Sequence, residues 1–360
     1  MLPIVIANRI LTVGPAYLPP KGGIAQTVYN YSKYIFPESH FSYVANSCDG
    51  SRIKKIYRLI SSFSHFFILL LFKRSIRIVH IHSASNFSFK RSSWFVNIAR
   101  LFNKKIIMHI HGGGFNAFFN NGHDSFVKKI LNKCDAIVVL SEEWQDWFRN
   151  ELQCDNVSVV PNVIPEPQPF KKTLGDEKFH LLFLGLINEE KGVFDLMQAI
   201  ADSKEQLHGK FQFHIAGNGM VSRLKNVIID KGLQDIVKYE GWVDSIAKHE
   251  LFSTCDALIL PSYTEGLPIS ILEAMSYRMP IISTPVGGIP SIVEDGANGF
   301  LVEPGDRAGF IEKIMQLIGN RNLAETMGEE SFKRIDKHFP ATVGSVLRGI
   351  YEEQINYSSL

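Results

Sequence analysis

The sequence predicts an α/β protein in which helices wrap parallel sheets. Short apolar runs rich in Ile and Val alternate with helical stretches along the chain, which is typical of such sheets. A proline-rich segment, residues 161–169, interrupts the alternation once. A length of 360 residues also favours two hydrophobic cores over one. We therefore expect two α/β domains joined at a hinge.

Residues 1–160 contain the elements expected for the first domain. Strands are expected at Ile4–Ile6, Ile78–Ile81, Lys105–His109 and Ala136–Leu140, and helices between them, for example at Ile24–Ile35 and Trp94–Phe102. The apolar beginning of the chain is expected to form the first strand rather than a signal peptide. It lacks a basic leading region, and Arg9 interrupts it.

The longest apolar stretch of the chain is Phe63–Phe72. It is too short to span a bilayer, which takes roughly 20 residues. Basic residues flank it on both sides, namely Lys54, Lys55, Arg58, Lys73, Arg74 and Arg77. We expect this stretch to be a buried helix of the first domain. The alternative is a helix that touches a membrane surface.

The charge of the chain is distributed unevenly between its halves. Residues 1–160 hold 19 Lys and Arg against 9 Asp and Glu, a net charge of +10, whereas residues 161–360 hold 19 against 27, a net charge of −8. The basic half is therefore expected to meet an anionic partner. The four cysteines are scattered without a Cys-x-x-Cys pair, so neither a zinc site nor a disulfide framework is indicated. A reducing cytoplasm is the expected location.

After the proline-rich segment the alternation of strands and helices begins again. Strands are expected at His180–Leu184, Phe211–Ala216, Val237–Tyr239, Ala257–Leu260 and Pro280–Ser283. The segment 261–306 is chemically the most informative, because it holds two glutamates, Glu265 and Glu273, with seven residues between them. Glu265 lies in a Gly/Pro loop after an apolar strand. Glu273 lies in the helix that Pro268 opens, since proline suits the first position of a helix.

A strand, a tight turn and a helix start place these carboxylates near the carboxyl end of a parallel sheet, where open α/β folds bind ligands. Free N–H groups at a helix start favour anionic or hydroxyl-rich ligands. Glu265 can accept hydrogen bonds from sugar hydroxyls, and Glu273 can accept them from a second polyol. The alternative is that the two glutamates form an ordinary solvated helix face. The Gly/Pro turn and the glycine turns that follow favour the ligand site.

Residues 265–302 resemble the donor-sugar site of retaining glycosyltransferases of family 4, which have the two-domain GT-B architecture. The resemblance implies two Rossmann-like domains facing a central cleft. Residues 1–165 would form the acceptor-side domain, and residues 170–340 would bind the nucleotide-sugar. The last helix, at about 342–360, would cross back onto the first domain.

The resemblance also implies roles for individual residues. In that family the first glutamate lies near the transferred sugar and the second binds the nucleotide ribose, which here are Glu265 and Glu273. Gly266 and Leu267, in the turn between them, would contribute to donor binding. We expect Glu265 to hydrogen-bond the donor sugar rather than to act as a covalent nucleophile. Family membership implies that the sugar is transferred with retention of configuration, and the leaving phosphate would help to deprotonate the acceptor.

Lys191 is the residue expected to hold the donor diphosphate. It stands at a helix start near Gly192, where an ammonium group beside free N–H groups can bind phosphate. The alternative is an ordinary surface lysine. The segment resembles the family's G-R-x-x-x-x-K-G pattern, but Leu186 replaces the usual arginine. One positive charge is therefore missing or comes from another residue.

Two glycine turns fit the same site. Gly217, Asn218 and Gly219 follow a strand and resemble the family's nucleotide-proximal turn, although an ordinary turn is the alternative. In the first half, Gly22 and Gly23 precede a helix, and two glycines there let the backbone approach a phosphate or sugar closely. The family has such a loop facing the cleft. A simple helix-entry turn is the alternative.

Four histidines end two expected strands of the first half. His111 begins a glycine-rich loop and matches the family's cleft histidine near the donor sugar, so it is a candidate catalytic residue beside Glu265 and Lys191. His109 alternates with it and ranks below it, as a candidate core residue. His80 and His82 end the neighbouring strand and are candidates for the acceptor side.

Together these observations predict a glycosyltransferase. The expected donor is a nucleotide-sugar, with a UDP-sugar favoured, and the expected acceptor is a glycan or a lipid-linked molecule. An anionic membrane surface is a possible further partner, which would make the protein peripheral to the membrane, and nucleic acid is not expected. No cofactor or metal is expected, since Asp-x-Asp is absent and Lys191 with helix-start amides can replace a metal.

Two other functions remain open at this point. One is a GT-B epimerase or hydrolase acting on a nucleotide-sugar, which would need no acceptor. The other is a non-catalytic subunit that binds a sugar nucleotide, suggested by Leu186. The sequence argues against a P-loop ATPase and a nicotinamide dehydrogenase, because it contains no G-x-x-x-x-G-K-[ST] and no G-x-G-x-x-G after its first strand.

Overall fold

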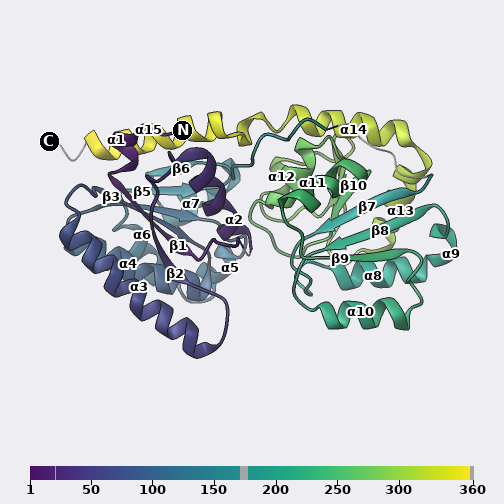
Figure 1. Cartoon of the computed structure of the whole chain (residues 1–360), viewed down its shortest axis with the longest axis horizontal. Helices are drawn as coiled ribbons and strands as arrows, with labels where there is room; N and C mark the ends of the chain where they lie inside the picture. Colours follow the sequence, from purple (N-terminus) through teal and green to yellow (C-terminus); the bar gives the residue numbers. More distant parts are fainter. Residues whose placement is uncertain (21, 171–176, 357–360) are drawn as a thin grey trace. The chain divides into compact units, whose positions relative to one another are not determined.

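The computed structural model describes residues 1–20, 22–170 and 177–356, and the chain divides into two compact units (Figure 1). Unit 1 comprises Met1–Pro165 and Lys337–Leu360, and unit 2 comprises Glu166–Asp336. The boundary lies within the proline-rich segment. Each unit contains one six-stranded parallel sheet. The prediction of two Rossmann-like α/β sheets is therefore confirmed.

The sheet of unit 1 has the strand order β2-β1-β3-β4-β5-β6. Its strands are β1 (Ile10–Pro15), β2 (Ser42–Ser47), β3 (Ile78–Ser83), β4 (Lys105–Ile110), β5 (Ala136–Val139) and β6 (Val157–Val159). The interior strands are rich in Ile and Val because both faces of a parallel sheet are covered. The loops that follow β1, β3 and β4 leave from the same, carboxyl edge of the sheet.

The prediction of a strand at Ile4–Ile6 is wrong. These residues lie in a short helix, α1 (Ile4–Ala7), which follows the extended residue Pro3. Ile6 and Ala7 are buried, whereas Ile4 and Val5 are more than half exposed, so the apolar run packs along one side only. The first strand is β1 instead, which pairs with both β2 and β3.

Helices cover both faces of this sheet. They are α2 (Gly23–Asn30), continued by the π-helix η1 (Tyr31–Ile35), and α3 (Arg52–Phe72), α4 (Asn86–Leu101), α5 (Phe115–Asn120), α6 (Asp124–Leu131), α7 (Glu142–Leu152) and α15 (Pro340–Asn356). On one face the rings of Phe66 on α3 and Phe95 on α4 meet edge to face at 5.1 Å inside a large apolar cluster. The opposite face is covered by η1 and α15, whose Tyr31 and Tyr351 are fully buried. Figure 1 shows α3 and α15 on opposite sides of the sheet.

The last helix belongs to unit 1, as predicted. The hydroxyl group of Tyr351 on α15 lies 2.7 Å from Nδ1 of His80 on β3. Val343, Leu347 and Ile355 of the same helix join the apolar cluster on this face. The expected end of the helix, residues 357–360, lies outside the described residues.

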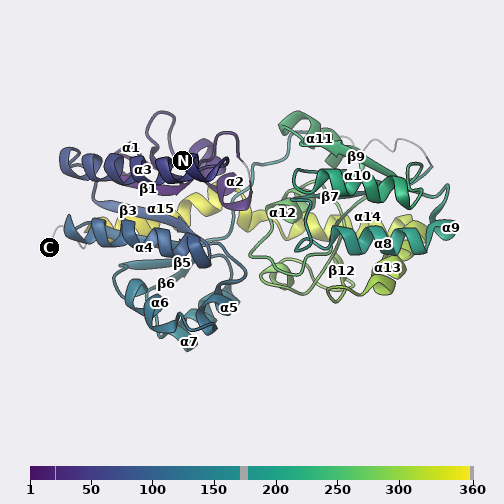
Figure 2. The same cartoon turned by 90° about the horizontal axis from the view of Figure 1, so that it is seen from below.

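Helix α3 differs from the expectation of a buried helix. Only Ser62, Phe66 and Leu70 of its 21 residues are buried, and they form a narrow inner stripe that contacts the sheet. Many of its other apolar side chains are exposed to solvent, such as Phe72 at 75%. The physical reason is that α3 lies on the outside of the unit, against α4 and β2, with no further layer over it (Figure 2).

The sheet of unit 2 has the order β12-β11-β10-β7-β8-β9. Its strands are β7 (Phe179–Leu184), β8 (Phe211–Ala216), β9 (Val237–Gly241), β10 (Ala257–Leu260), β11 (Ile281–Ser283) and β12 (Gly299–Leu301). Its helices are α8 (Val193–Asp202), α9 (Lys204–Leu207), α10 (Val221–Asp230), α11 (Ser245–Thr254), α12 (Ile269–Ser276), α13 (Arg307–Gly319) and α14 (Arg321–Lys333). Pro268 is the N-cap of α12 rather than its first residue, one position earlier than predicted.

The inner stripe of α3 yields a first test. Phe66→Ala should lower the free energy of unfolding of unit 1 by about 3–5 kcal/mol, because it removes a fully buried ring. Phe72→Ala, on the same helix and exposed, should change it by no more than about 0.5 kcal/mol. Denaturant unfolding of the two variants measures both values. Equal losses would show that α3 packs differently.

Candidate functional site

Three neighbouring strands of unit 2 carry the predicted donor residues on the loops at their carboxyl ends. The loop after β7 holds Lys191, the loop after β8 holds Gly217–Gly219, and the loop after β10 holds Glu265. Strand β7 pairs with both β8 and β10. The three loops therefore meet at one edge of the sheet, where parallel α/β folds bind ligands.

The glycines of the loop after β8 permit a close approach of two backbones. Gly217 and Gly219 both have positive φ, at 148° and 126°. A Cβ atom at either position would overlap a backbone carbonyl of the loop after β7, that of Gly185 or of Ile187. The N–H group of Ile187 donates to the carbonyl of Asn218 at 2.7 Å. These contacts fix the loop after β7 against the turn at Gly217–Gly219. Asn218 and Gly219 remain exposed.

The loop that carries Lys191 is fixed to the loop after β10. Gly192, the N-cap of α8, adopts a left-handed conformation with φ of 67°, and a Cβ atom there would overlap the carbonyl of Pro261. The N–H group of Tyr263 donates to the carbonyl of Glu190 at 2.8 Å. The N–H group of Lys191 itself donates to Oδ1 of Asn188 at 3.0 Å. Lys191 therefore stands at a defined place beside the start of α8.

Lys191 and Glu265 form an ion pair. Glu265 is only 7% exposed, and its Oε1 also accepts a hydrogen bond of 2.8 Å from the hydroxyl of Ser262. A buried carboxylate needs such partners, because removing its charge from water is costly. The structure thus brings together two predicted site residues that stand 74 positions apart in the chain.

Two glycines, Gly287 and Gly288, pack against the backbone of Glu265 and Gly266. Gly287 has φ of 59°, and a Cβ atom there would overlap the carbonyl of Glu265. The N–H group of Gly288 donates to the carbonyl of Gly266 at 2.6 Å. Leu267, the next residue, is buried.

Glu273, on α12, is paired with a lysine that the sequence analysis missed. Its carboxylate is 7% exposed and forms an ion pair with Lys248 of α11. The two residues are 25 positions apart on different helices, and no local pattern connects them. Lys248 is therefore a new candidate residue of this site.

Leu186, where an arginine is usual, is 51% exposed. It lies just after β7 and directly before Ile187, whose N–H group binds the turn at Gly217–Gly219. A second cation reaches the same loop from α10, because Arg223 forms an ion pair with Glu189 and lies 4.0 Å above the ring of Phe194. The loop after β7 therefore carries Lys191 and also binds Arg223 through Glu189.

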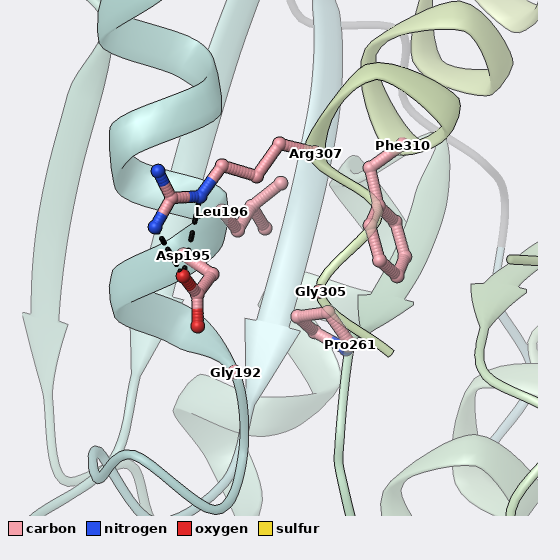
Figure 3. Close-up of a pocket in the computed structure, with 7 residues that line it drawn as sticks. All are labelled: Gly192, Asp195, Leu196, Pro261, Gly305, Arg307 and Phe310. Atoms are coloured by element: carbon pink, nitrogen blue, oxygen red, sulfur yellow. Dashed lines mark hydrogen bonds and ion pairs between the residues drawn. The ribbon is translucent and has the colours of Figure 1, made fainter. Parts of the chain in front are cut away.

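A shallow hollow lies behind Lys191, lined by Gly192, Asp195, Leu196, Pro261, Gly305, Arg307 and Phe310 (Figure 3). Asp195 on α8 accepts hydrogen bonds from Arg307 at the start of α13, at 2.5 Å from Nη2 and 3.2 Å from Nε. Its other oxygen accepts one from the Tyr263 hydroxyl at 3.1 Å. The ion pair in Figure 3 thus fastens the first turn of α8 to the rest of unit 2.

The predicted residues of unit 1 also lie at the carboxyl edge of their sheet. Gly22, with φ of 93°, is the N-cap of α2. Gly22 and Gly23 are exposed, and a Cβ atom at either would have no neighbour within 4 Å among the described residues. The protein itself thus sets no steric demand for glycine at these two positions. His111 directly follows β4, and its N–H group donates to the carbonyl of Ser83 at 2.8 Å.

The four strand-end histidines form a stack inside unit 1. Ring centroids are 4.5 Å apart for His80 and His82, and 4.0 Å apart for His109 and His111. Nδ1 of His82 lies 2.8 Å from Nε2 of His111, so each ring fixes the tautomer of the other. His109 is a core residue, as its alternation suggested. His80 and His82 are almost completely buried, so the prediction that they line an acceptor surface is wrong.

Burial keeps this stack neutral. It lowers the pKa of His80 and of His111 to about 3, and it holds the pKa of His82 and His109 well below the usual range, with neighbouring histidines adding to the shift. Nitrogens of His80, His82 and His109 lie within 4.8 Å of one another. Because the rings are nearly parallel, their in-plane lone pairs do not point at one centre. We therefore assign His80, His82 and His109 a packing role.

Comparison with known proteins identifies the family. The sequence profile described as "Glycosyl transferases group 1" matches residues 166–334, and the profile "Glycosyltransferase Family 4" matches residues 37–166. The chain is a family 4 glycosyltransferase.

Relatives of this glycosyltransferase are known by sequence. An uncharacterised glycosyltransferase of Methanocaldococcus jannaschii is 30% identical over 63% of this chain and 62% of its own length. The amylovoran biosynthesis glycosyltransferase AmsK of Erwinia amylovora is 30% identical over 54% of this chain and 50% of its own length. The matched regions thus span between a half and two thirds of these relatives.

The glycosyltransferase also resembles solved structures along its whole length. HepE of Anabaena, crystallised in complex with UDP, has a TM-score of 0.74 and 18% identity, and the match covers 98% of this chain and 100% of that one. At this identity the likeness establishes the GT-B fold alone.

Gly287 gives a direct test of how Glu265 is held. Gly287→Ala should lower the melting temperature of the glycosyltransferase and its rate of sugar transfer, because the new Cβ atom would displace the Glu265 carbonyl. Gly296→Ala is the matched control, since Gly296 also has positive φ, at 77°, but no atom stands where its Cβ would be. Both carry the left-handed penalty of about 1–2 kcal/mol. Equal losses of activity would show that the Gly287 contact does not position Glu265.

The neutral histidine stack predicts acid sensitivity. In the unfolded chain a histidine takes up a proton below about pH 6.5, whereas His80 does so only near pH 3. Its stabilisation is therefore complete above pH 6.5 and is lost as the pH falls towards 3, by up to about 1.4 kcal/mol per pH unit for each such histidine. His109→Phe should flatten the decline in unfolding free energy between pH 7 and 5, and the exposed-site control His208→Phe should not. An unchanged slope in His109→Phe would contradict this account.

Proposed function

We propose that the protein transfers a sugar from a nucleotide-sugar, with a UDP-sugar favoured, to a glycan or lipid-linked acceptor with retention of configuration. The observation that carries the proposal is the ion pair between the partly exposed Lys191 and the buried Glu265, among three loops at the carboxyl edge of unit 2. The UDP bound to HepE supports a uridine donor. The relative in amylovoran biosynthesis supports a place in polysaccharide assembly.

In this proposal Lys191 stabilises the leaving diphosphate. Its ammonium group stands beside the start of α8, whose first N–H groups have no partner within the helix. A fixed cation and fixed dipoles are effective where negative charge develops, because they need no rearrangement during the reaction. Arg223, which forms an ion pair with Glu189 of the same loop, is a candidate for the charge that Leu186 does not supply.

Each carboxylate has a separate task. Glu265 accepts hydrogen bonds from hydroxyls of the transferred sugar, in exchange for part of its contact with Lys191. Glu273 accepts them from the ribose, and Lys248 orients its carboxylate. We further propose that Gly217–Gly219, Gly266 and the Leu267 backbone contact the donor.

The roles proposed for unit 1 rest on His111 and the Gly22–Gly23 turn. His111 has one ring nitrogen bonded to His82, which leaves the other for a sugar hydroxyl. Gly22 and Gly23 are exposed, with open space where side chains would be, which suits a ligand close to the backbone.

An epimerase or hydrolase acting on the same donor would release its product without an acceptor, and a purely binding subunit would show no turnover.

Substitutions should distinguish the role of Glu265 in sugar transfer from the role of Glu273 in nucleotide binding. Glu265→Gln should lower the rate of transfer more than the affinity for UDP, because its carboxylate serves the sugar. Glu273→Gln should weaken UDP binding itself, because its carboxylate serves the ribose. Lys191→Ala should reduce both, since a charge-assisted hydrogen bond contributes about 1.5–3 kcal/mol.

Calorimetry with UDP and a transfer assay with a panel of nucleotide-sugars measure these effects. Lys238→Ala is the control, as an exposed lysine of the same unit that is paired with Glu240. Near-normal transfer by Lys191→Ala, or equal loss of UDP affinity in the two glutamine variants, would contradict the assigned roles.

A further inference from the structure

We propose that the outer face of α3 docks unit 1 on an anionic membrane surface. This face is defined by the exposed apolar residues of the helix, namely Ile53, Ile56, Tyr57, Ile60, Phe67, Ile68 and Leu71. They recur every three or four positions, so they share one side of the helix. Such a stripe normally faces a protein core, but here it faces solvent.

The exposure of this face is large and continuous. Ile53 is 81% exposed, Ile60 is 62% exposed and Leu71 is 49% exposed, so the stripe is open over the full length of α3. Soluble proteins rarely leave large contiguous apolar areas uncovered unless they bind something there. Scattered apolar side chains would need no such explanation.

Helix α3 is anchored in unit 1 by its other side. Phe66 and Leu70 are buried in the main apolar cluster, and Phe63 stacks on Phe95 at 4.6 Å. Among the described residues α3 is the one helix long and apolar enough to cross a membrane, yet crossing would pull these side chains out of the core. Its geometry instead suits a helix lying in the plane of the membrane surface.

Helix α4 widens the apolar surface. Phe87, Trp94 and Leu101 are spaced by seven residues and are all strongly exposed. Trp94 stacks on Phe63 of α3 at 5.5 Å, so the two exposed faces adjoin. An exposed tryptophan suits the boundary between lipid headgroups and acyl chains, since its ring is both apolar and polar.

The charged side chains of α3 and of the segment that follows it are all positive. Between Asp49 and Asp124 the sequence holds twelve Lys and Arg and no acidic residue. Six of these cations lie on α3 or within five residues of its end and are exposed, namely Lys54, Lys55, Arg58, Lys73, Arg74 and Arg77. None of the six has an ion-pair partner within the part of the chain that the structure describes. Their charge therefore remains available to anionic headgroups.

This combination favours a lipid surface over other occupants. A second copy of the chain would bring two sets of unpaired positive charges together, which is repulsive. Nucleic acid would use the charges but leave the apolar stripe exposed to water. An anionic membrane surface satisfies both features at once, because headgroups meet the cations and the acyl boundary covers the stripe. The inference does not depend on the proposed donor, and vesicle binding is measured without it.

Vesicle flotation tests the proposal on the full chain. The wild type should float with phosphatidylcholine vesicles containing phosphatidylglycerol at low ionic strength, and high salt should release it, as screening of charge requires. The triple variant Lys54→Ser, Lys55→Ser, Arg58→Ser should bind about a hundredfold more weakly, at roughly fivefold per charge. The control Lys33→Ser, Lys129→Ser, Arg149→Ser removes three exposed charges from the same unit outside the face and should bind as the wild type does.

A second pair of variants tests the apolar stripe. Ile53→Ser with Ile60→Ser should lower vesicle binding at least tenfold and leave the melting temperature unchanged, because both side chains are exposed. Ile4→Ser with Ile229→Ser removes two comparably exposed side chains elsewhere and should have no effect. Three outcomes would overturn the proposal: no binding of the wild type to anionic vesicles, equal loss in test and control variants, or a stable dimer that the Ile53/Ile60 variant dissolves.

Discussion

The buried carboxylate of Glu265 constrains the loops around it. A charge that is 7% exposed needs a counter-charge and hydrogen bonds, and Lys191 and Ser262 provide them. Placing Lys191 requires the left-handed Gly192 packed on Pro261, and placing Glu265 requires Gly287 packed on its carbonyl. The glycines of these loops thus serve one purpose, which is to let backbones approach closely enough for a charged pair to form at the sheet edge.

Much of this arrangement could be predicted, because each site residue of unit 2 follows a strand. A parallel strand covered on both faces is a run of Ile and Val, so Ala257–Leu260 was visible in the sequence, and with it the location of Glu265. The error at Ile4–Ile6 has the opposite cause. Three apolar residues carry no period, and the extended Pro3 favours a helix start there. The pairing of Ile10 with β3, rather than the local sequence, sets the start of β1.

Other features lie beyond local sequence. Lys248 and Glu273 form an ion pair between two helices. No sequence pattern near either residue predicts this contact. The period of α3 shows that it is amphipathic but not which side faces inward, and the structure buries the narrow stripe with Phe66 rather than the wide apolar one. His80 and His82 likewise looked like surface residues because they end a strand, yet Tyr31 of η1 packs on both rings and Tyr351 of α15 contacts His80.

The central claim is that Lys191 serves both the Glu265 carboxylate and the donor diphosphate. A double-mutant cycle tests it most directly, with UDP affinity measured by calorimetry for the wild type, Lys191→Met, Glu265→Gln and the double variant. If the two residues act through one another, the effect of Glu265→Gln will depend on the presence of Lys191, with a coupling above about 0.5 kcal/mol. Additive effects, within about 0.3 kcal/mol, would show that the pair in this structure has no part in nucleotide binding.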